Sequence, residues 1–431
     1  SASSELSRVL VEFDTTAIAA ERTAGTIPAS GSVDFYLRMY DAEHVESTPS
    51  DFTLTVAAIS QSWNEGTGLD MNNYTDLGES NWLKANSTTS WTHQGGDFLT
   101  GSGTTPLMHT LQAFDGGTED LSVDVTTIVE EWLIGTTGSY ETGSLSYYTK
   151  KFFARGSEFF HRRPVIEARF NDSEGDDSSN FYISSSRAPA EDNLNSLYFY
   201  NYIRGQLVDV PSGAPLVRLY SGSEGPTASA LFLPFGGAVP TAGLNRAGST
   251  KVSTGVYSAS FAFDSSSITT VYPVWSNNAD NEELFTGSAI TVKPLESATD
   301  YPIKDWVVNI TNLKTTYSTD ETATFRLYVR PKNWNPNLYT VAQTQIETTP
   351  IEKAYYKLER VVDNFEVISY GTGSRNESYT QLSYDISGNY FDLDMSMLQS
   401  GYNYQLSFLF NLAGEYSEQR AKFKFRVSDG D

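Results

Sequence analysis

Residues 32–40 read SVDFYLRMY, and this short stretch decides the fold class. Phe35, Leu37 and Met39 alternate with more polar neighbours, which is the period of two expected when one face of a strand lies in a core. Residues 52–59, FTLTVAAI, repeat the pattern, and the segments between such stretches are rich in Gly, Asn, Ser and Thr, as turns are. The sequence therefore predicts an all-β protein.

Tryptophan and glycine recur between Ser62 and Phe170. Trp63 opens a Trp-Asn-Glu-Gly-Thr-Gly stretch, Trp91 precedes a Gly-Gly-Asp-Phe stretch, and Trp132 follows a Val-Asp-Val-Thr stretch. Large aromatic side chains pin loops against a core, and glycines allow the chain to turn tightly. The pattern indicates the framework of a β-sandwich and contains no recognisable catalytic motif.

Length and composition narrow the class of protein further. The chain has 431 residues, and domains of roughly 100–200 residues predict two to four of them. The formal net charge of −24 argues against nucleic acid and anionic membranes as partners, because both bind basic surfaces. There is no cysteine, which excludes disulfides and thiolate metal sites. No apolar run approaches the roughly 20 residues of a membrane-spanning helix, and the polar start of the sequence as given is not a signal peptide.

An acidic run marks the clearest boundary. Residues 171–179 read NDSEGDDSS and contain no apolar side chain, which is typical of a linker. We predict a jelly-roll-like sandwich at 1–172, an acidic linker at 173–179, and immunoglobulin-like β-sandwiches at 180–298 and 299–431.

Further strands are expected along the whole chain. Residues 8–14 predict an opening strand, and residues 150–155 and 163–170 predict strands that close the first domain. In residues 421–427 apolar side chains alternate with Lys and Arg, and cations at such spacing suit an exposed sheet edge. Other candidates are 197–200, 216–220, 255–263, 288–292, 307–310, 323–329 and 402–410.

One helix is expected, over residues 124–133. Thr126 or Thr127 is placed to cap its first turn, and Gly135 is placed to end it. Ile128, Val129 and Trp132 are then expected on one face.

The order of the motifs resembles the DNRLRE family, a jelly-roll-like β-sandwich module of surface and extracellular proteins. The matching stretches are Trp63 to Gly68, Gly95 to Phe98, Val123 to Trp132, and Arg163 to Glu167. The resemblance implies that the first domain is such a sandwich.

The whole chain also resembles an uncharacterised structural protein of T4-like tailed phages of marine bacteria. The stretches that carry this likeness are 48–52, 68–71, 150–155, 202–207 and 255–261. It implies a place in the virion, in the neck, tail or baseplate, with other virion proteins as partners in a symmetric multi-copy assembly.

The tryptophans and arginines supply the candidate site residues. Trp63, Trp82 and Trp91 either form an exposed platform that stacks on a cell-surface glycan or pin loops at the mouth of the sandwich. A small cationic island, Arg155, Arg162 and Arg163, stands out in an acidic chain. These arginines either pair internally with Glu158 and Glu167 or dock onto an acidic neighbouring subunit.

Chemistry that needs a cofactor has little support in the sequence. The histidines, His44, His93, His109 and His161, form no metal-binding pair, and there is no Gly-x-Ser-x-Gly elbow and no phosphate-binding glycine loop. We expect no cofactor and no catalytic residue. Oxygen-rich segments at 70–76 and 277–283 are candidates for Ca²⁺, with a solvated turn as the alternative.

Three functional hypotheses follow. The first is a non-enzymatic virion structural protein. The second is a glycan-binding adhesin on a cell surface or in a phage fibre, which would place the chain outside the cell. The third is a glycoside-degrading enzyme, which would need paired carboxylates about 5–10 Å apart in a cleft.

Overall fold

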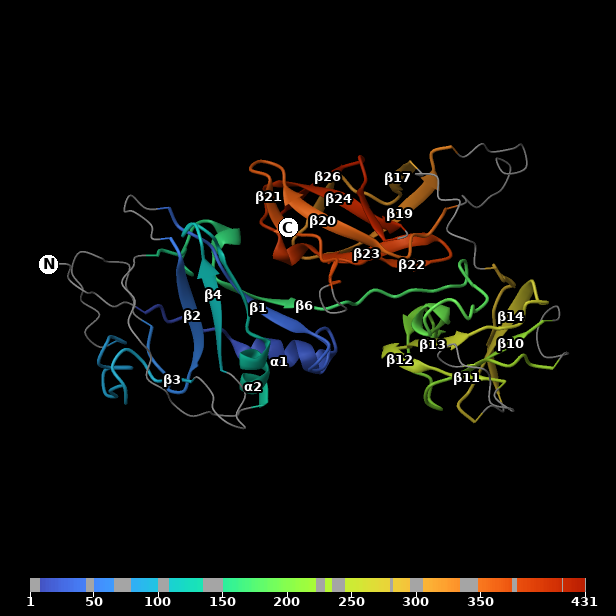
Figure 1. Cartoon of the computed structure of the whole chain (residues 1–431), viewed down its shortest axis with the longest axis horizontal. Helices are drawn as coiled ribbons and strands as arrows, with labels where there is room; N and C mark the ends of the chain where they lie inside the picture. Colours follow the sequence, from blue (N-terminus) through green and yellow to red (C-terminus); the bar gives the residue numbers. More distant parts are fainter. Residues whose placement is uncertain are drawn as a thin grey trace. The chain divides into compact units, whose positions relative to one another are not determined.

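The computed structural model describes residues 8–43, 50–65, 79–99, 108–134, 150–221, 229–234, 245–279, 282–294, 305–333, 348–373, 378–412 and 414–430 (Figure 1). Strands dominate these residues, and the predicted all-β class is confirmed. The chain divides into two compact units. Unit 1 comprises Ser1–Asn171 with Gly373–Tyr379, and unit 2 comprises Asp172–Thr372 with Thr380–Asp431.

Unit 1 contains two small antiparallel sheets around a shared apolar core. One sheet has the order β5-β1-β6 and the other the order β3-β2-β4. The strands are β1 (Asp34–Met39), β2 (Phe52–Ile59), β3 (Phe98–Leu99), β4 (His109–Phe114), β5 (Leu121–Asp124) and β6 (Val165–Arg169). The alternation predicted for residues 32–40 is confirmed, because Phe35, Leu37 and Met39 are buried.

The expectation of a strand at residues 8–14 is wrong. A helix, α1 (Thr15–Ala24), follows instead, and the Asp14 carboxylate caps it by accepting the Thr16 backbone N–H at 2.9 Å. Gly25 ends the helix in the left-handed conformation. The predicted helix near residue 126 is present as α2 (Thr126–Ile134), which contacts α1 (Figure 1).

The face of α2 differs in one residue from the expected face. Ile128 and Val129 are buried, whereas Trp132 is 36% exposed. The Thr126 hydroxyl accepts the Phe35 backbone N–H at 2.8 Å, so this side chain attaches the helix to β1. Asp124 takes the capping role by accepting the Thr126 N–H.

The first part of unit 2 packs two sheets around an aromatic core. Their orders are β12-β13-β7 and β11-β10-β14-β15, with β16 also paired to β14. The strands are β7 (Leu194–Tyr200), β10 (Leu216–Tyr220), β11 (Ala247–Gly248), β12 (Thr250–Ser253), β13 (Val256–Ala262), β14 (Thr270–Ser276), β15 (Glu283–Thr286) and β16 (Ile290–Thr291). A two-stranded hairpin, β8 (Tyr202–Ile203) and β9 (Gln206–Leu207), follows β7. Phe181, Phe261 and Phe263 are fully buried between the sheets.

The second part of unit 2 has the orders β17-β19-β23-β22 and β18-β26-β24-β20-β21, with β25 paired to β24. The strands are β17 (Trp306–Ile310), β18 (Thr316–Ser318), β19 (Thr322–Pro331), β20 (Ala354–Arg360), β21 (Phe365–Ile368), β22 (Ser383–Asp385), β23 (Gly388–Asp394), β24 (Asn403–Leu412), β25 (Glu415–Glu418) and β26 (Phe423–Ser428). The order β17-β19-β23-β22 matches strands A-B-E-D of immunoglobulin sandwiches, and the order β26-β24-β20 matches strands G-F-C. Phe325, Phe408 and Phe410 lie fully buried in its core.

The alternation in the last strand is confirmed, but its position is not the expected one. Phe425 and Val427 are buried, and Lys424 and Arg426 are exposed. However, β26 lies between β18 and β24, so it is not an edge strand. Its cations face solvent because that face of the sheet is uncovered. No helix among the described residues is long and apolar enough to cross a membrane.

Candidate functional site

Trp91 is a structural residue of the loop between β2 and β3. Its side chain is 7% exposed, and its indole N–H donates to the Asn81 carbonyl at 2.7 Å. Its backbone N–H donates to the Leu83 carbonyl at 3.1 Å. A ring buried and bonded in this way offers no open face to a sugar.

Trp82 is half-buried and packs against a glycine turn. The Arg8 guanidinium lies 5.3 Å from the Trp82 ring and 4.8 Å from the Phe98 ring, and its Nη1 donates to the Gly95 carbonyl at 2.9 Å. Trp63 is also half-buried, and the glycines that follow it lie outside the described residues. The three tryptophans therefore do not share one exposed plane.

The close packing of Trp82 against Gly95 can be tested by substitution of the glycine. It has φ +90°, and a Cβ there would lie 2.9 Å from Trp82 Cη2. We expect Gly95→Ala to lower the free energy of unfolding by about 2–3 kcal/mol, from backbone strain plus displacement of the ring. Gly25→Ala is the matched control, since Gly25 has φ +86° but nothing within 4 Å of the added methyl group. It should cost about 1 kcal/mol in the same denaturant titration. Equal losses would contradict the proposed role of the Trp82 contact.

The buried side chain of Asp97 holds the Gly-Gly-Asp-Phe motif in place through hydrogen bonds to the backbone. It is 1% exposed and accepts the backbone N–H groups of Thr92 at 2.9 Å and His93 at 2.7 Å. Burial acts to raise the pKa of Asp97, but these hydrogen bonds outweigh it and hold the pKa below its ordinary value. The motif is thus a folded loop with an ionised anchor.

The three arginines predicted to form a cationic island lie in the segment before β6, and their contacts differ from the internal pairs expected. Arg155 is 80% exposed and pairs with Glu65 at 2.6 Å. Glu167, an expected partner, binds Arg38 at 3.2 Å and Arg169 at 2.9 Å instead. In the part of the chain that the structure describes, Arg162 and Arg163 form no ion pair.

Arg162 and Arg163 instead rest on phenylalanine rings. Arg162 lies 5.3 Å from the Phe153 ring and 5.9 Å from the Phe159 ring, and Arg163 lies 5.8 Å from the Phe160 ring. Phe159 is 50% exposed and Phe160 38% exposed. We call Phe159, Phe160, Arg162 and Arg163 the arginine–phenylalanine surface. The sequence identified its arginines, but the phenylalanines that orient them were not expected to take part.

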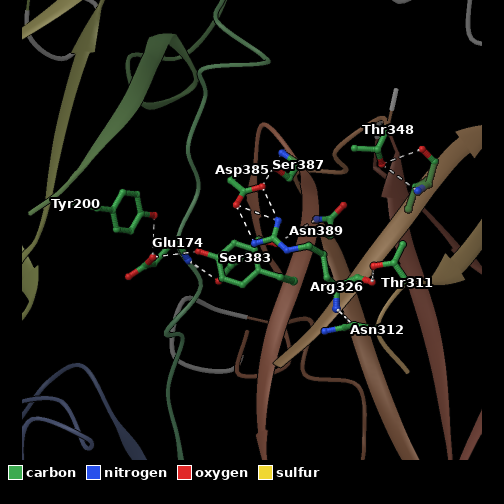
Figure 2. A network of polar contacts seen from close by, with 12 residues as sticks. Glu174, Tyr200, Thr311, Asn312, Arg326, Thr348, Ser383, Asp385, Ser387 and Asn389 are labelled. Atoms are coloured by element: carbon green, nitrogen blue, oxygen red, sulfur yellow. Dashed lines mark hydrogen bonds and ion pairs between the residues drawn. The ribbon is translucent and has the colours of Figure 1, made fainter. Parts of the chain in front are cut away.

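The segment predicted as an acidic linker is packed inside unit 2. The Glu174 backbone N–H donates to the Ser383 hydroxyl at 2.9 Å (Figure 2). Gly175 forms a parallel bridge with Tyr384. The Glu174 carboxylate accepts hydroxyl groups from Tyr200 at 3.3 Å and Tyr390 at 3.2 Å. Burial raises the pKa of Glu174 above its usual value.

Neighbouring contacts tie β19 to the hairpin of β22 and β23. Arg326 binds Asp385 through both terminal nitrogens, at 2.8 Å from Nη1 and 3.1 Å from Nη2 (Figure 2). Asp385 also accepts the Ser387 backbone N–H at 2.7 Å. A two-pronged contact fixes both side chains, so this part of unit 2 is a rigid polar framework.

The metal candidates remain without support. Residues 70–76 lie outside the described residues, as does part of 277–283 and His44. Among the residues that the structure does describe, no group of at least three His, Cys, Asp or Glu side chains is arranged to hold a metal ion.

Comparisons with known proteins give no family. No protein-family model matches the chain, and no curated protein matches it. Among solved structures, the chain is similar to the crystal structure of trypsin-activated alpha-2-macroglobulin from Escherichia coli, with 11% identity and a TM-score of 0.18. The match covers 92% of this chain and 22% of that chain, so this chain spans well under two thirds of that neighbour. A likeness at this TM-score carries no inference about function.

Proposed function

We propose that the chain is a non-enzymatic structural protein of a tailed-phage particle, attached to neighbouring subunits through the arginine–phenylalanine surface. That surface is the observation that carries the proposal. It combines exposed aromatic rings with guanidinium groups, and these residue types are enriched at protein–protein contacts.

The charges of the surface define the partner it suits. Arg162 and Arg163 are exposed cations in a chain of net charge −24. Arg163 Nε donates to the Ser157 carbonyl at 2.9 Å, and guanidinium groups near aromatic rings can still donate their other N–H groups to carboxylates. The surface therefore suits an acidic face of another subunit, and such complementarity fixes register and speeds association.

The setting of the proposal comes from the sequence. The likeness to a structural protein of T4-like tailed phages supports a place in the neck, tail or baseplate of the virion. Rigid sandwiches suit that role, since they present fixed surfaces, and repetition in a symmetric assembly multiplies weak contacts.

Charge reversal at the surface tests the contact. We expect Arg162→Glu with Arg163→Glu to reduce incorporation into particles at least about tenfold, because two attractive contacts become repulsive. The variant should keep the wild-type circular dichroism spectrum, since both side chains are exposed. Lys84→Glu, which reverses an exposed cation elsewhere in unit 1, should incorporate normally. Normal incorporation of the double variant would exclude this surface as the contact.

Electron cryo-microscopy of whole particles from the source tests the location. Density for this chain at a symmetric neck, tail or baseplate position is the expected result. Absence from every ordered layer would overturn the proposal. A glycan array with wild-type protein and Trp63→Ala would then test the adhesin alternative, which depends on an accessible tryptophan face.

A further inference from the structure

Lys150 is a buried amine held against a carboxylate. Its side chain is 4% exposed, and Nζ lies 2.5 Å from Oδ1 of Asp41, which is itself 15% exposed. The rings of Phe114 and Phe152 each lie 5.3 Å from Nζ. The pair is therefore largely shielded from water, with aromatic rings on one side.

Backbone pairing fixes the two reacting residues in register. Asp41 directly follows β1, and it forms an antiparallel bridge with Phe152. The Ala42 N–H donates to the Lys151 carbonyl at 3.0 Å, and the Phe153 N–H donates to the Tyr40 carbonyl at 3.0 Å. Backbone hydrogen bonds thus place Asp41 beside Lys150, 109 positions away in sequence, and this placement does not depend on either side chain.

A second carboxylate lies in the adjoining loop. Lys150 Nζ donates to the backbone carbonyls of Gly117 at 2.8 Å and Glu119 at 2.9 Å. The Glu119 side chain accepts the Gly116 N–H through Oε1, whereas its Oε2 is buried without a hydrogen-bond partner in the part of the chain described. The Gly116 N–H, aided by other backbone N–H groups and the Lys150 charge, lowers the pKa of Glu119 below its usual value.

We propose that Lys150 and Asp41 join in an intramolecular amide bond, an isopeptide cross-link between the segment after β1 and the segment before β6. The cross-link is a covalent modification of the folded chain and needs no other reactant.

The reaction balances as a dehydration. One proton passes from the Lys150 ammonium to the Asp41 carboxylate across their contact, which leaves a neutral amine facing a neutral carboxyl group. The Nζ–Cγ bond forms, one Cγ–O bond breaks, and the departing hydroxyl takes one proton from Nζ and leaves as water. Nothing is oxidised or reduced. The amide nitrogen keeps one N–H, which can donate to the carbonyl of Gly117 or Glu119.

Burial and proximity distinguish this pair from ordinary ion pairs. Reacting atoms held in contact react as if at very high concentration, and exclusion of water favours the loss of water. Lys251 and Asp209 form the natural comparison, since their 2.7 Å ion pair is 48% and 47% exposed. Water solvates that pair, so it should remain an ion pair.

Intact-mass spectrometry of the full chain under denaturing conditions tests the proposal. The expected result is a mass lower than that of the sequence by one water. A digest should contain one branched peptide joining residues 41 and 150, with no tryptic cleavage after Lys150 and normal cleavage after Lys251. A wild-type mass equal to that of the sequence, with separate peptides for the two residues, would overturn the proposal.

Two variants separate the cross-link from other losses of water. Lys150→Arg keeps the positive charge but lacks a nucleophilic amine, and Asp41→Asn tests the acid. Lys150→Arg should have the full sequence mass and wild-type circular dichroism. A succinimide formed at Asp41 alone would also lack one water, but it would persist in Lys150→Arg and open with hydroxylamine; that outcome would overturn the cross-link.

Discussion

Asn389→Ala is expected to lower the free energy of unfolding of unit 2 by about 3–5 kcal/mol. Asn389 is fully buried at the start of β23. Its Oδ1 accepts the Ile351 N–H at 2.8 Å, and its Nδ2 donates to the Ile351 carbonyl at 2.8 Å. Alanine leaves both backbone groups buried without these bonds, and each unsatisfied group costs about 1–3 kcal/mol.

The chain supplies a matched control in Asn312. Its Oδ1 accepts the Arg326 N–H at 2.9 Å, and its Nδ2 donates to the Thr324 carbonyl at 2.7 Å, so it clamps a backbone in the same way (Figure 2). Asn312 is exposed, and water can replace its bonds. Asn312→Ala should therefore cost at most about 1 kcal/mol.

Urea titrations monitored by circular dichroism would measure both variants. Asn389→Asp adds a further test, because it keeps the acceptor for the Ile351 N–H but places an oxygen against the Ile351 carbonyl. We expect it to be at least as destabilising as Asn389→Ala. Similar small losses of stability for Asn389→Ala and Asn312→Ala would show that burial does not determine how much the hydrogen bonds of the asparagine contribute to the free energy of unfolding.

A second large effect is expected with pH, at Asp177. Its Oδ2 accepts the Ser196 N–H at 2.7 Å and its Oδ1 accepts the Tyr384 hydroxyl at 2.7 Å. Burial raises the pKa of Asp177 from 3.8 to about 7, against these two hydrogen bonds, and the charges of Glu352 and Asp176 act in the same direction as burial.

The direction of the pH effect follows from proton binding. Between pH about 4 and about 7 the folded chain holds a proton on Asp177 that the unfolded chain has lost. The stability contributed by this group is therefore complete below pH about 4 and is lost as pH rises through about 7, by on the order of 4 kcal/mol. Glu174 and Asp176 have pKa values raised by burial, and they add to the loss in the same direction.

Urea titrations of wild type and Asp177→Asn at pH about 5 and about 8 measure how much Asp177 contributes to the change in the free energy of unfolding with pH. The amide resembles the protonated acid, so Asp177→Asn should lose about 2–3 kcal/mol less than wild type over that interval. Asp209→Asn is the control, because Asp209 is an exposed acid whose pKa is lowered, chiefly by the Lys251 contact. An unchanged pH dependence in Asp177→Asn would contradict the assignment.

Local pattern predicted the strands well where one face is buried. The period of two in β1 and in β26 is a property of a few consecutive side chains, and it needs no knowledge of the partner strand. The same approach failed at residues 8–14. Val9 and Val11 favour a strand by propensity, but residues 8–14 are not assigned to a strand, Val9 is 68% exposed, and the helix capped by Asp14 begins only after them, at Thr15.

The candidate site was predicted less completely, because its contacts join distant parts of the chain. The arginines at 155, 162 and 163 stand out in an acidic sequence, but the rings that support Arg162 and Arg163 were not expected there. The acidic segment around Glu174 was interpreted as a solvated linker because its composition is polar. It is instead packed against Ser383, Tyr390 and Tyr200, which lie 26 or more positions away.

The sequence by itself determined the all-β class, one helix and the alternation of several strands. These features depend on neighbouring residues and on composition. Only the tertiary structure decided that Trp91 is a buried loop anchor, that the acidic segment is packed, and that Lys150 lies against Asp41. The physical reason is that burial of a polar group, and hence its pKa and reactivity, depends on strands paired across long distances in sequence.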